Sequence, residues 1–169
     1  DINLIIAKKV QTILQQQDIT VIMTREEDKG LYEERTSNKK AQDMKNRCTL
    51  INQKEPDCVV SIHQNSYHEE YVSGAQVFYY GNSEEGKKLA ESLQDKMVSY
   101  LDPQNHRKAK PNDSYYLLKK TEAPIVIVEC GFLSNWEEAK KLQQDSYQNQ
   151  VAWAVAMGVI NYLSEDRSF

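Results

Sequence analysis

Two apolar stretches of this chain end in side chains that can do chemistry. Residues 58–62 lead into His63, and residues 124–128 lead into Glu129. A neutral imidazole can bind a metal ion, and a carboxyl group that burial desolvates has a raised pKa, which suits a general base. A catalytic zinc site needs three protein ligands and an open fourth position, so this pair would be half of a zinc hydrolase site.

Each of the two residues also has an ordinary interpretation. His63 is flanked by Ser61 and Asn65, and polar neighbours of this kind fix the tautomer of a metal ligand as well as they satisfy a structural histidine. Glu129 is either a desolvated base or an exposed strand terminus. The position of these residues alone leaves both alternatives open.

The other histidines and the cysteines are weaker candidates. His68 lies in a polar stretch without the H-E-x-x-H spacing of helical zinc peptidases, and His106 lies in a basic loop. A Cys–His nucleophile pair is conceivable, but Cys58 begins an apolar strand with no electropositive setting for a thiolate. The odd count of three cysteines predicts buried free thiols rather than a disulfide framework.

The elements that position these residues alternate along the chain. Long β-branched runs predict strands buried on both faces, and polar residues at their carboxyl ends reach the rim where open α/β sheets bind ligands. The pattern predicts helices over 1–17, 33–53, 84–100, 136–142 and 147–163, and further strands over 19–24, 74–80 and 115–119. Strands that alternate with long helices favour an α/β three-layer sandwich.

Size and composition limit the classes of function. The 169 residues fit one domain, without repeats or a linker, and the net charge of −4 gives no electrostatic case for nucleic acid. No window approaches 18 uninterrupted apolar residues, so the sequence predicts no membrane span.

Several segments, in order along the chain, carry a resemblance to a known family. They are residues 1–7, 21–25, Arg47, 61–66, Gly74 and 128–135. Together they resemble the zinc-dependent N-acetylmuramoyl-L-alanine amidases over nearly the whole chain. Residues 105–110 and 113–118 look most like the spore-cortex amidases of endospore formers, the CwlD type.

This resemblance implies a mixed, mostly parallel sheet flanked by helices and one zinc ion. His63 matches the second zinc-binding histidine and Glu129 the catalytic glutamate. The family's remaining ligands are a histidine in a D-P-G-H-G motif at a strand end and a glutamate, both upstream of the segment that matches Asp1. We therefore expect residues 1–169 to be a single amidase catalytic domain that lacks the first strand of its sheet.

The resemblance also implies a reaction. Zinc would lower the pKa of water and polarise the amide between N-acetylmuramic acid and L-alanine, while Glu129 takes a proton and returns it to the leaving amine. Asn65, Arg107 and Lys110 are the candidates for binding the glycan strand and the acidic stem peptide. The expected place of action is outside the cytoplasmic membrane, in the cell wall or the forespore intermembrane space, during spore cortex maturation.

Two alternatives remain at this point. One is a metal-poor, amidase-like domain that binds peptidoglycan or a protein partner without catalysis. The other is a zinc peptidase on a related α/β fold. Whether a regulatory protein partner controls zinc loading is also open.

Overall fold

The protein folds around one mixed sheet, seen here in a computed structural model that describes residues 1–165. Its strands are β1 (Val59–Asn65), β2 (Gln76–Tyr79), β3 (Lys110–Pro111) and β4 (Ile125–Phe132). They lie in the order β1-β4-β2-β3, with β1 parallel to β4, β4 antiparallel to β2, and β2 parallel to β3. The expected mixed, mostly parallel sheet is confirmed.

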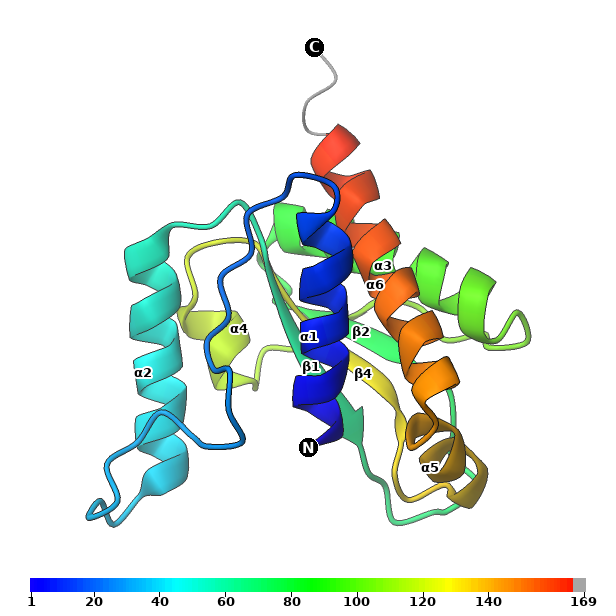
Figure 1. Cartoon of the computed structure of the whole chain (residues 1–169), viewed down its shortest axis with the longest axis horizontal. Helices are drawn as coiled ribbons and strands as arrows, with labels where there is room; N and C mark the ends of the chain where they lie inside the picture. The colour runs from blue at the N-terminus through cyan, green and yellow to red at the C-terminus, as the bar shows by residue number, and fades with distance from the viewer. Residues whose placement is uncertain (166–169) are drawn as a thin grey trace.

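Helices cover both faces of this sheet (Figure 1). They are α1 (Ile2–Gln15), α2 (Lys39–Lys54), α3 (Glu84–Leu101), α4 (Tyr116–Lys120), α5 (Trp136–Leu142) and α6 (Asp145–Glu165). The expected three-layer α/β arrangement is therefore also confirmed. None of the helices within residues 1–165 combines the length and the apolar character that a membrane span requires.

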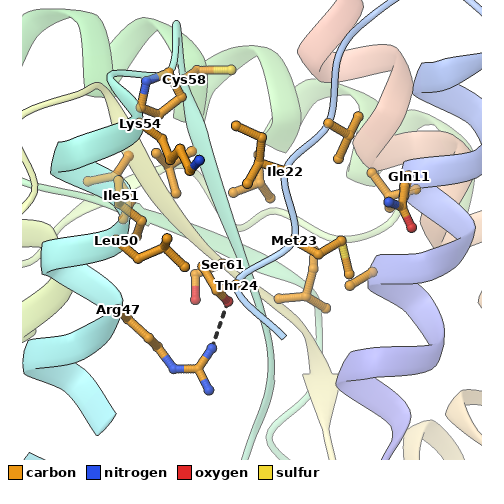
Figure 2. Close-up of a pocket in the computed structure, with 18 of the residues that line it drawn as sticks. Gln11, Ile22, Met23, Thr24, Arg47, Leu50, Ile51, Lys54, Cys58 and Ser61 are labelled. Atoms are coloured by element: carbon orange, nitrogen blue, oxygen red, sulfur yellow. Dashed lines mark hydrogen bonds between the residues drawn. The ribbon is translucent and has the colours of Figure 1, made fainter. Parts of the chain in front are cut away.

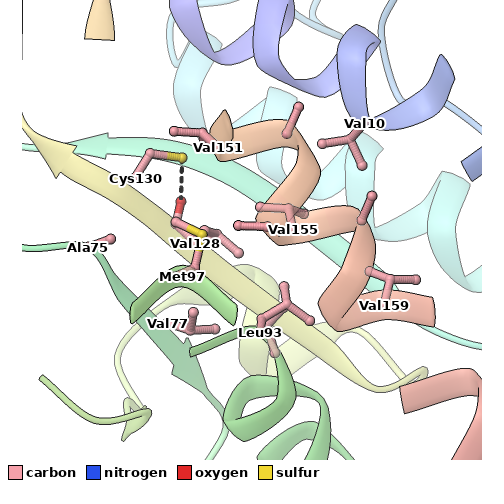
Figure 3. Close-up of a cluster of buried hydrophobic side chains, with 14 of the residues drawn as sticks. Val10, Ala75, Val77, Leu93, Met97, Val128, Cys130, Val151, Val155 and Val159 are labelled. Atoms are coloured by element: carbon pink, nitrogen blue, oxygen red, sulfur yellow. Dashed lines mark hydrogen bonds between the residues drawn. The ribbon is translucent and has the colours of Figure 1, made fainter. Parts of the chain in front are cut away.

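The larger hydrophobic core lies between the sheet and α1, α3 and α6. Alternate residues of β4 point into it, because successive side chains of a strand face opposite sides of a sheet. Figure 3 shows Val128 and Cys130 of β4 beside Val151 and Val155 of α6. This core holds β4 rigidly from one side.

The smaller core lies on the other face, under α2 and α4. Ile125 and Ile127 of β4 pack there with Cys48 of α2 and with Leu117 and Leu118 of α4. By the same alternation, Glu129 follows Ile127 on this face of β4. The Glu129 side chain therefore faces the side of the sheet that α2 and α4 cover.

Two predicted strands are wrong. Residues 19–24 form no strand, because within residues 1–165 β1 pairs only with β4 and no neighbouring strand offers them backbone partners. Residues 115–119 belong largely to helix α4 instead. The Asn112 side chain accepts hydrogen bonds from the backbone of Ser114 (2.9 Å) and Tyr115 (3.1 Å), and this local turn begins the helix.

One strand and one helix differ in detail from their predictions. β1 is half-buried along its whole length rather than buried on both faces, because it is an edge strand. The helix expected over 33–53 begins only at Lys39, where Asn38 accepts a hydrogen bond from the backbone of Ala41 (3.1 Å). The residues before it form a loop against α2.

Candidate active site

His63 and Glu129 lie side by side in neighbouring strands. In the parallel pairing of β1 and β4, His63 is the register partner of Glu129. The two residues therefore meet as the sequence predicted, although neither ends its strand. β4 continues to Phe132, which pairs with Asn65 of β1 beyond an irregularity in the register, and its side chains are still buried.

The Glu129 carboxyl group is buried without compensation. The residue is 6% exposed, and its Oε2 atom has no hydrogen-bond partner among residues 1–165. Burial raises the pKa of this carboxyl group to about 7. A carboxyl group with a pKa near the working pH can both take and return a proton, which is what a general base requires.

His63 is held as a neutral imidazole. Its Nε2 atom lies 3.0 Å from the Ser61 hydroxyl, within hydrogen-bond distance. Burial lowers the pKa of His63, and the positive charges of Arg47 and Arg25 lower it further. Neutral imidazole is the form that binds a metal ion.

Two neighbours of Glu129, Gln76 and Tyr115, were not predicted as site residues from the sequence. Gln76 of β2 is its antiparallel register partner, and the Tyr115 ring packs edge-on against Phe78 with centroids 6.0 Å apart. Burial and the charge of Glu129 raise the pKa of Tyr115, so its hydroxyl stays protonated beside the carboxyl group. The alternation of Gln76 and Phe78 with Ala75 and Val77 was the available signal, but the antiparallel pairing that brings Gln76 to Glu129 is not visible in sequence.

Of the predicted substrate-binding residues, Arg107 lies beside this centre, whereas Lys110 lies farther out, on the edge strand β3. Arg107 donates to the Ser73 carbonyl (2.8 Å) and to the Gln76 side chain (3.2 Å), and its guanidinium lies 5.1 Å from the centroid of the Phe132 ring. Arg107 therefore contacts Gln76, the register partner of Glu129, and its hydrogen bond to Ser73 also holds the loop before β2 in place. Lys110 in β3 is exposed.

Asn65 and the loops beyond it form a connected rim. The Asn65 side chain accepts a hydrogen bond from the backbone of Ser66 (2.8 Å), and its carbonyl accepts one from Leu133 (2.8 Å). Glu138 of α5 holds two further backbone groups, those of Gly74 (2.9 Å) and Phe132 (2.8 Å). Glu138 was not a predicted site residue, because its role depends on loops that are distant in sequence.

The cysteines do not supply a nucleophile. All three are free thiols, and burial raises the pKa of Cys58 and of Cys130 to about 12. A thiol with such a pKa is not a thiolate near neutral pH, so a Cys–His mechanism finds no support.

A deep cleft runs along the free edge of β1. It encloses about 560 Å³ and is bounded by residues 19–25, α1, α2 and β1. Figure 2 shows Ile22 and Met23 on one side and Leu50 and Ile51 of α2 on the other. At the end near His63, Arg47 donates a hydrogen bond to the Thr24 hydroxyl (2.8 Å). This cleft is lined mainly by apolar side chains.

The described residues supply only some of the ligands that a zinc site needs. No group of three His, Cys, Asp or Glu side chains that could hold a metal ion occurs within residues 1–165. His63 supplies one neutral imidazole, and the unpartnered Oε2 atom of Glu129 lies next to it in register. These residues fit one part of a zinc site and do not complete it.

Comparison with known proteins decides the family. Residues 1–161 match the N-acetylmuramoyl-L-alanine amidase family. The chain belongs to this family. The resemblance seen in the sequence is thereby confirmed, and members of the family are generally zinc-dependent.

Individual relatives agree with this assignment. The amidase is 40% identical to the germination-specific N-acetylmuramoyl-L-alanine amidase of Bacillus subtilis, over 98% of this chain and 70% of that protein. It matches the CwlD amidase of Clostridioides difficile, solved in complex with the GerS lipoprotein, with a TM-score of 0.95 and 39% identity. That match covers 98% of this chain and 86% of the other.

A further amidase from Clostridium difficile 630 has a TM-score of 0.86 and 31% identity, with 100% of this chain and 84% of that one covered. The germination-specific amidase and the CwlD amidase are relatives of the type that the sequence indicated.

The buried carboxyl group predicts a pH-dependent stability for the metal-free amidase. Because burial raises the pKa of Glu129 from 4.5 to about 7, the folded state holds the proton more tightly than the unfolded state. The protonated Glu129 carboxyl group therefore makes its full contribution to the free energy of unfolding below about pH 4.5. This contribution, about 3 kcal/mol, is lost as the pH rises through 7. The measurement is urea unfolding at pH 5 and at pH 8. Between these two pH values, we expect the free energy of unfolding of Glu129→Gln to fall less than that of the parent.

The exposed Glu137→Gln is the matched control, and it should keep the parental difference between the two pH values. An equal loss of stability in Glu129→Gln and in the parent would show that Glu129 does not carry this pH dependence.

Proposed function

We propose that this protein hydrolyses the amide between N-acetylmuramic acid and L-alanine in peptidoglycan, with Glu129 as the general base. The observation that carries the proposal is the buried, unpartnered Glu129 carboxyl group beside neutral His63 in a chain of the amidase family. In its deprotonated form Glu129 accepts a proton from the attacking water, and it then returns this proton to the amine of L-alanine.

His63 would be one zinc ligand, through the neutral imidazole that burial and the nearby arginines maintain. A bound zinc ion would polarise the amide carbonyl and lower the pKa of water. Gln76 and Tyr115 flank Glu129 and can donate hydrogen bonds to the substrate on that side. Asn65, Arg107 and Lys110 would contact substrate at the rim.

The cleft along β1 supports the proposal that a further strand, from a segment outside residues 1–169, completes the sheet. In the part of the chain that the structure describes, one edge of β1 has no strand partner, and residues 19–24 lie across the cleft without one. The side-chain oxygen of Asn3, which lines this cleft, is buried without a partner among residues 1–165. Such a strand would pair with the free edge of β1 and end near His63, where it would bring the remaining zinc ligands.

The biological setting that we infer is the spore cortex. One relative is named a germination-specific amidase, and the CwlD amidase was solved with a lipoprotein partner. We infer that this protein acts outside the cytoplasmic membrane, on cortex peptidoglycan. A regulatory protein partner of this kind is part of the proposal.

Digestion of purified cortex peptidoglycan by the full-length protein with zinc tests the reaction. We expect released stem peptides that carry a free L-alanine amino group, and glycan strands on which the same hydrolysis has generated free lactyl carboxyl groups. Shortened stem peptides that remain attached to the glycan would indicate a zinc peptidase instead.

A catalytically silent binding domain is the second candidate, because residues 1–165 hold no group of three metal ligands. The residues encoded before Asp1 discriminate between the two functions. A natural protein without a histidine and a glutamate there would favour the silent domain.

Arg107 and Lys110 have separable predicted effects. Arg107→Ala removes two hydrogen bonds and a ring contact, so we expect a loss of about 1 to 2 kcal/mol in unfolding free energy as well as a lower kcat/KM. Lys110→Ala, at an exposed position, should raise KM without a change in stability. Kinetics and thermal unfolding of both variants test this, and unchanged kinetics in both would remove these residues from the site.

A further inference from the structure

A second concavity lies beside the active site, between residues 25–32 and the first turn of α2. It encloses about 400 Å³, and we call it the basic pocket. Its charged lining consists of five cationic side chains and two acidic ones: Arg25, Lys29, Lys39, Lys40 and Arg47, with Asp28 and Asp43. The whole chain has a net charge of −4, so the pocket departs from the charge of the protein that surrounds it.

Most of these charges are paired. Arg25 is bonded to Asp1 and Asp28, and Arg47 lies 2.7 Å from the carboxylate of Asp43. Lys29 is paired with Glu27, outside the pocket lining, at 2.8 Å.

Lys39 and Lys40 are different. Neither makes an ion pair within residues 1–165, and both are exposed. Lys39 instead lies over the Tyr32 ring, 5.3 Å from its centroid.

The two lysines also stand where a helix disfavours them. They are the first residues of α2, whose first turn contains no acidic residue. The start of a helix carries partial positive charge, so a carboxylate is stabilised there and a lysine is destabilised. The cost of this arrangement would be relieved by an anion in the pocket.

The walls of the pocket are fixed by hydrogen bonds to α2. Asp43 accepts from the backbone of Leu31 (2.6 Å), and Asn46 donates to the Leu31 carbonyl (2.6 Å). Gln42 accepts from the backbone of Glu33 (2.9 Å). The loop that faces Lys39 is therefore held in place before any ligand binds, which lowers the entropy cost of binding.

The pocket is continuous with the catalytic side of the molecule. Arg25, Asp43 and Arg47 line both the basic pocket and the cleft along β1. Arg47 donates a hydrogen bond to Thr24, and Figure 2 shows both residues near Ser61. The Ser61 hydroxyl lies within hydrogen-bond distance of the His63 ring. Arg25 and Arg47 line the basic pocket, and their charges act on His63, so the pocket lies near His63 even when an added strand fills the cleft. A substrate whose scissile amide lies at His63 and Glu129 can therefore extend a charged group toward the pocket.

We propose that the basic pocket binds carboxylates of the stem peptide that follows L-alanine, with Lys39 and Lys40 as specificity-determining residues. This inference rests on the proposed function, because it assigns the peptide side of the same substrate. An acidic peptide matches the pocket in charge, and the two unpaired ammonium groups are its recognition elements.

Two synthetic ligands test the proposal. Both are N-acetylmuramoyl-L-alanyl peptides, and they differ in one group: the carboxyl group of the residue after L-alanine is either free or a carboxamide. Binding is measured by calorimetry to the full-length protein carrying Glu129→Gln, so that no turnover disturbs the titration. We expect the free carboxylate to bind about tenfold more tightly at low salt, as two exposed charge pairs allow.

Lys39→Gln/Lys40→Gln in the same background should reduce this ratio to about one. The control Lys8→Gln/Lys87→Gln makes the same change in net charge at exposed positions of α1 and α3, outside both pockets, and should keep the ratio. A parental protein that does not distinguish the ligands, or a double variant that still does, would overturn the assignment.

The outcome is separable from the proposed function. If the enzyme cleaves the muramoyl-L-alanine amide but binds both ligands equally, the pocket assignment fails and the function stands. If the ratio behaves as expected but no such amide is cleaved, the pocket assignment stands and the proposed reaction fails.

Discussion

Replacing Glu129 by glutamine should lower amide hydrolysis by about 100-fold to 10,000-fold and leave the fold intact. Glutamine has nearly the same volume but cannot accept the proton of the attacking water. Its neutral side chain also avoids a charge at a position that is 6% exposed, so the protein should be no less stable at pH 8. The measurement is the rate of release of L-alanine amino groups from peptidoglycan, with circular dichroism of the same samples.

Glu137→Gln on α5 is the control for this experiment, because it removes a carboxylate from an exposed position. It should keep parental activity. Substantial turnover by folded Glu129→Gln would exclude Glu129 as the general base, whatever the control shows.

Replacing His63 by alanine should weaken zinc binding by more than about 100-fold, because loss of even an indirect support of a metal site costs 10-fold to 100-fold. Activity at limiting zinc should fall with it. The measurement is a zinc titration of the full-length protein against a competing chelator. His63 is half-buried, so thermal unfolding of the variant must accompany the titration.

His68→Ala provides the comparison, since the His68 side chain is 74% exposed and lies only five residues later. It should bind zinc like the parent. A folded His63→Ala protein with parental zinc affinity would mean that His63 is a structural histidine bonded to Ser61.

The two residues that we propose for the chemistry, His63 and Glu129, were visible in the sequence because both follow long apolar runs. The pairing of those runs as β1 and β4 brings His63 and Glu129 into register. The sequence pattern also predicted the helices of the chain other than α4, and the helix expected over 136–142 has those bounds in α5. Local signals of this kind need no tertiary information.

The errors arose where tertiary contacts decide. Residues 19–24 have the composition of a strand, but a strand needs a partner and the edge of β1 beside them is free. Residues 115–119 are a short aromatic and apolar run typical of a strand, yet the Asn112 turn begins a helix there and Leu117 and Leu118 fill the smaller core. Gln76 reaches Glu129 only through an antiparallel pairing that neither segment encodes locally.

The most direct test of the whole account is a crystal structure of the full-length protein with zinc, with the metal located by its anomalous scattering. We expect one zinc ion bound to the His63 imidazole, Glu129 facing the open side of the metal, and an added strand between β1 and residues 19–24. Zinc located away from His63, or a cleft along β1 that stays empty in the zinc-loaded enzyme, would contradict it.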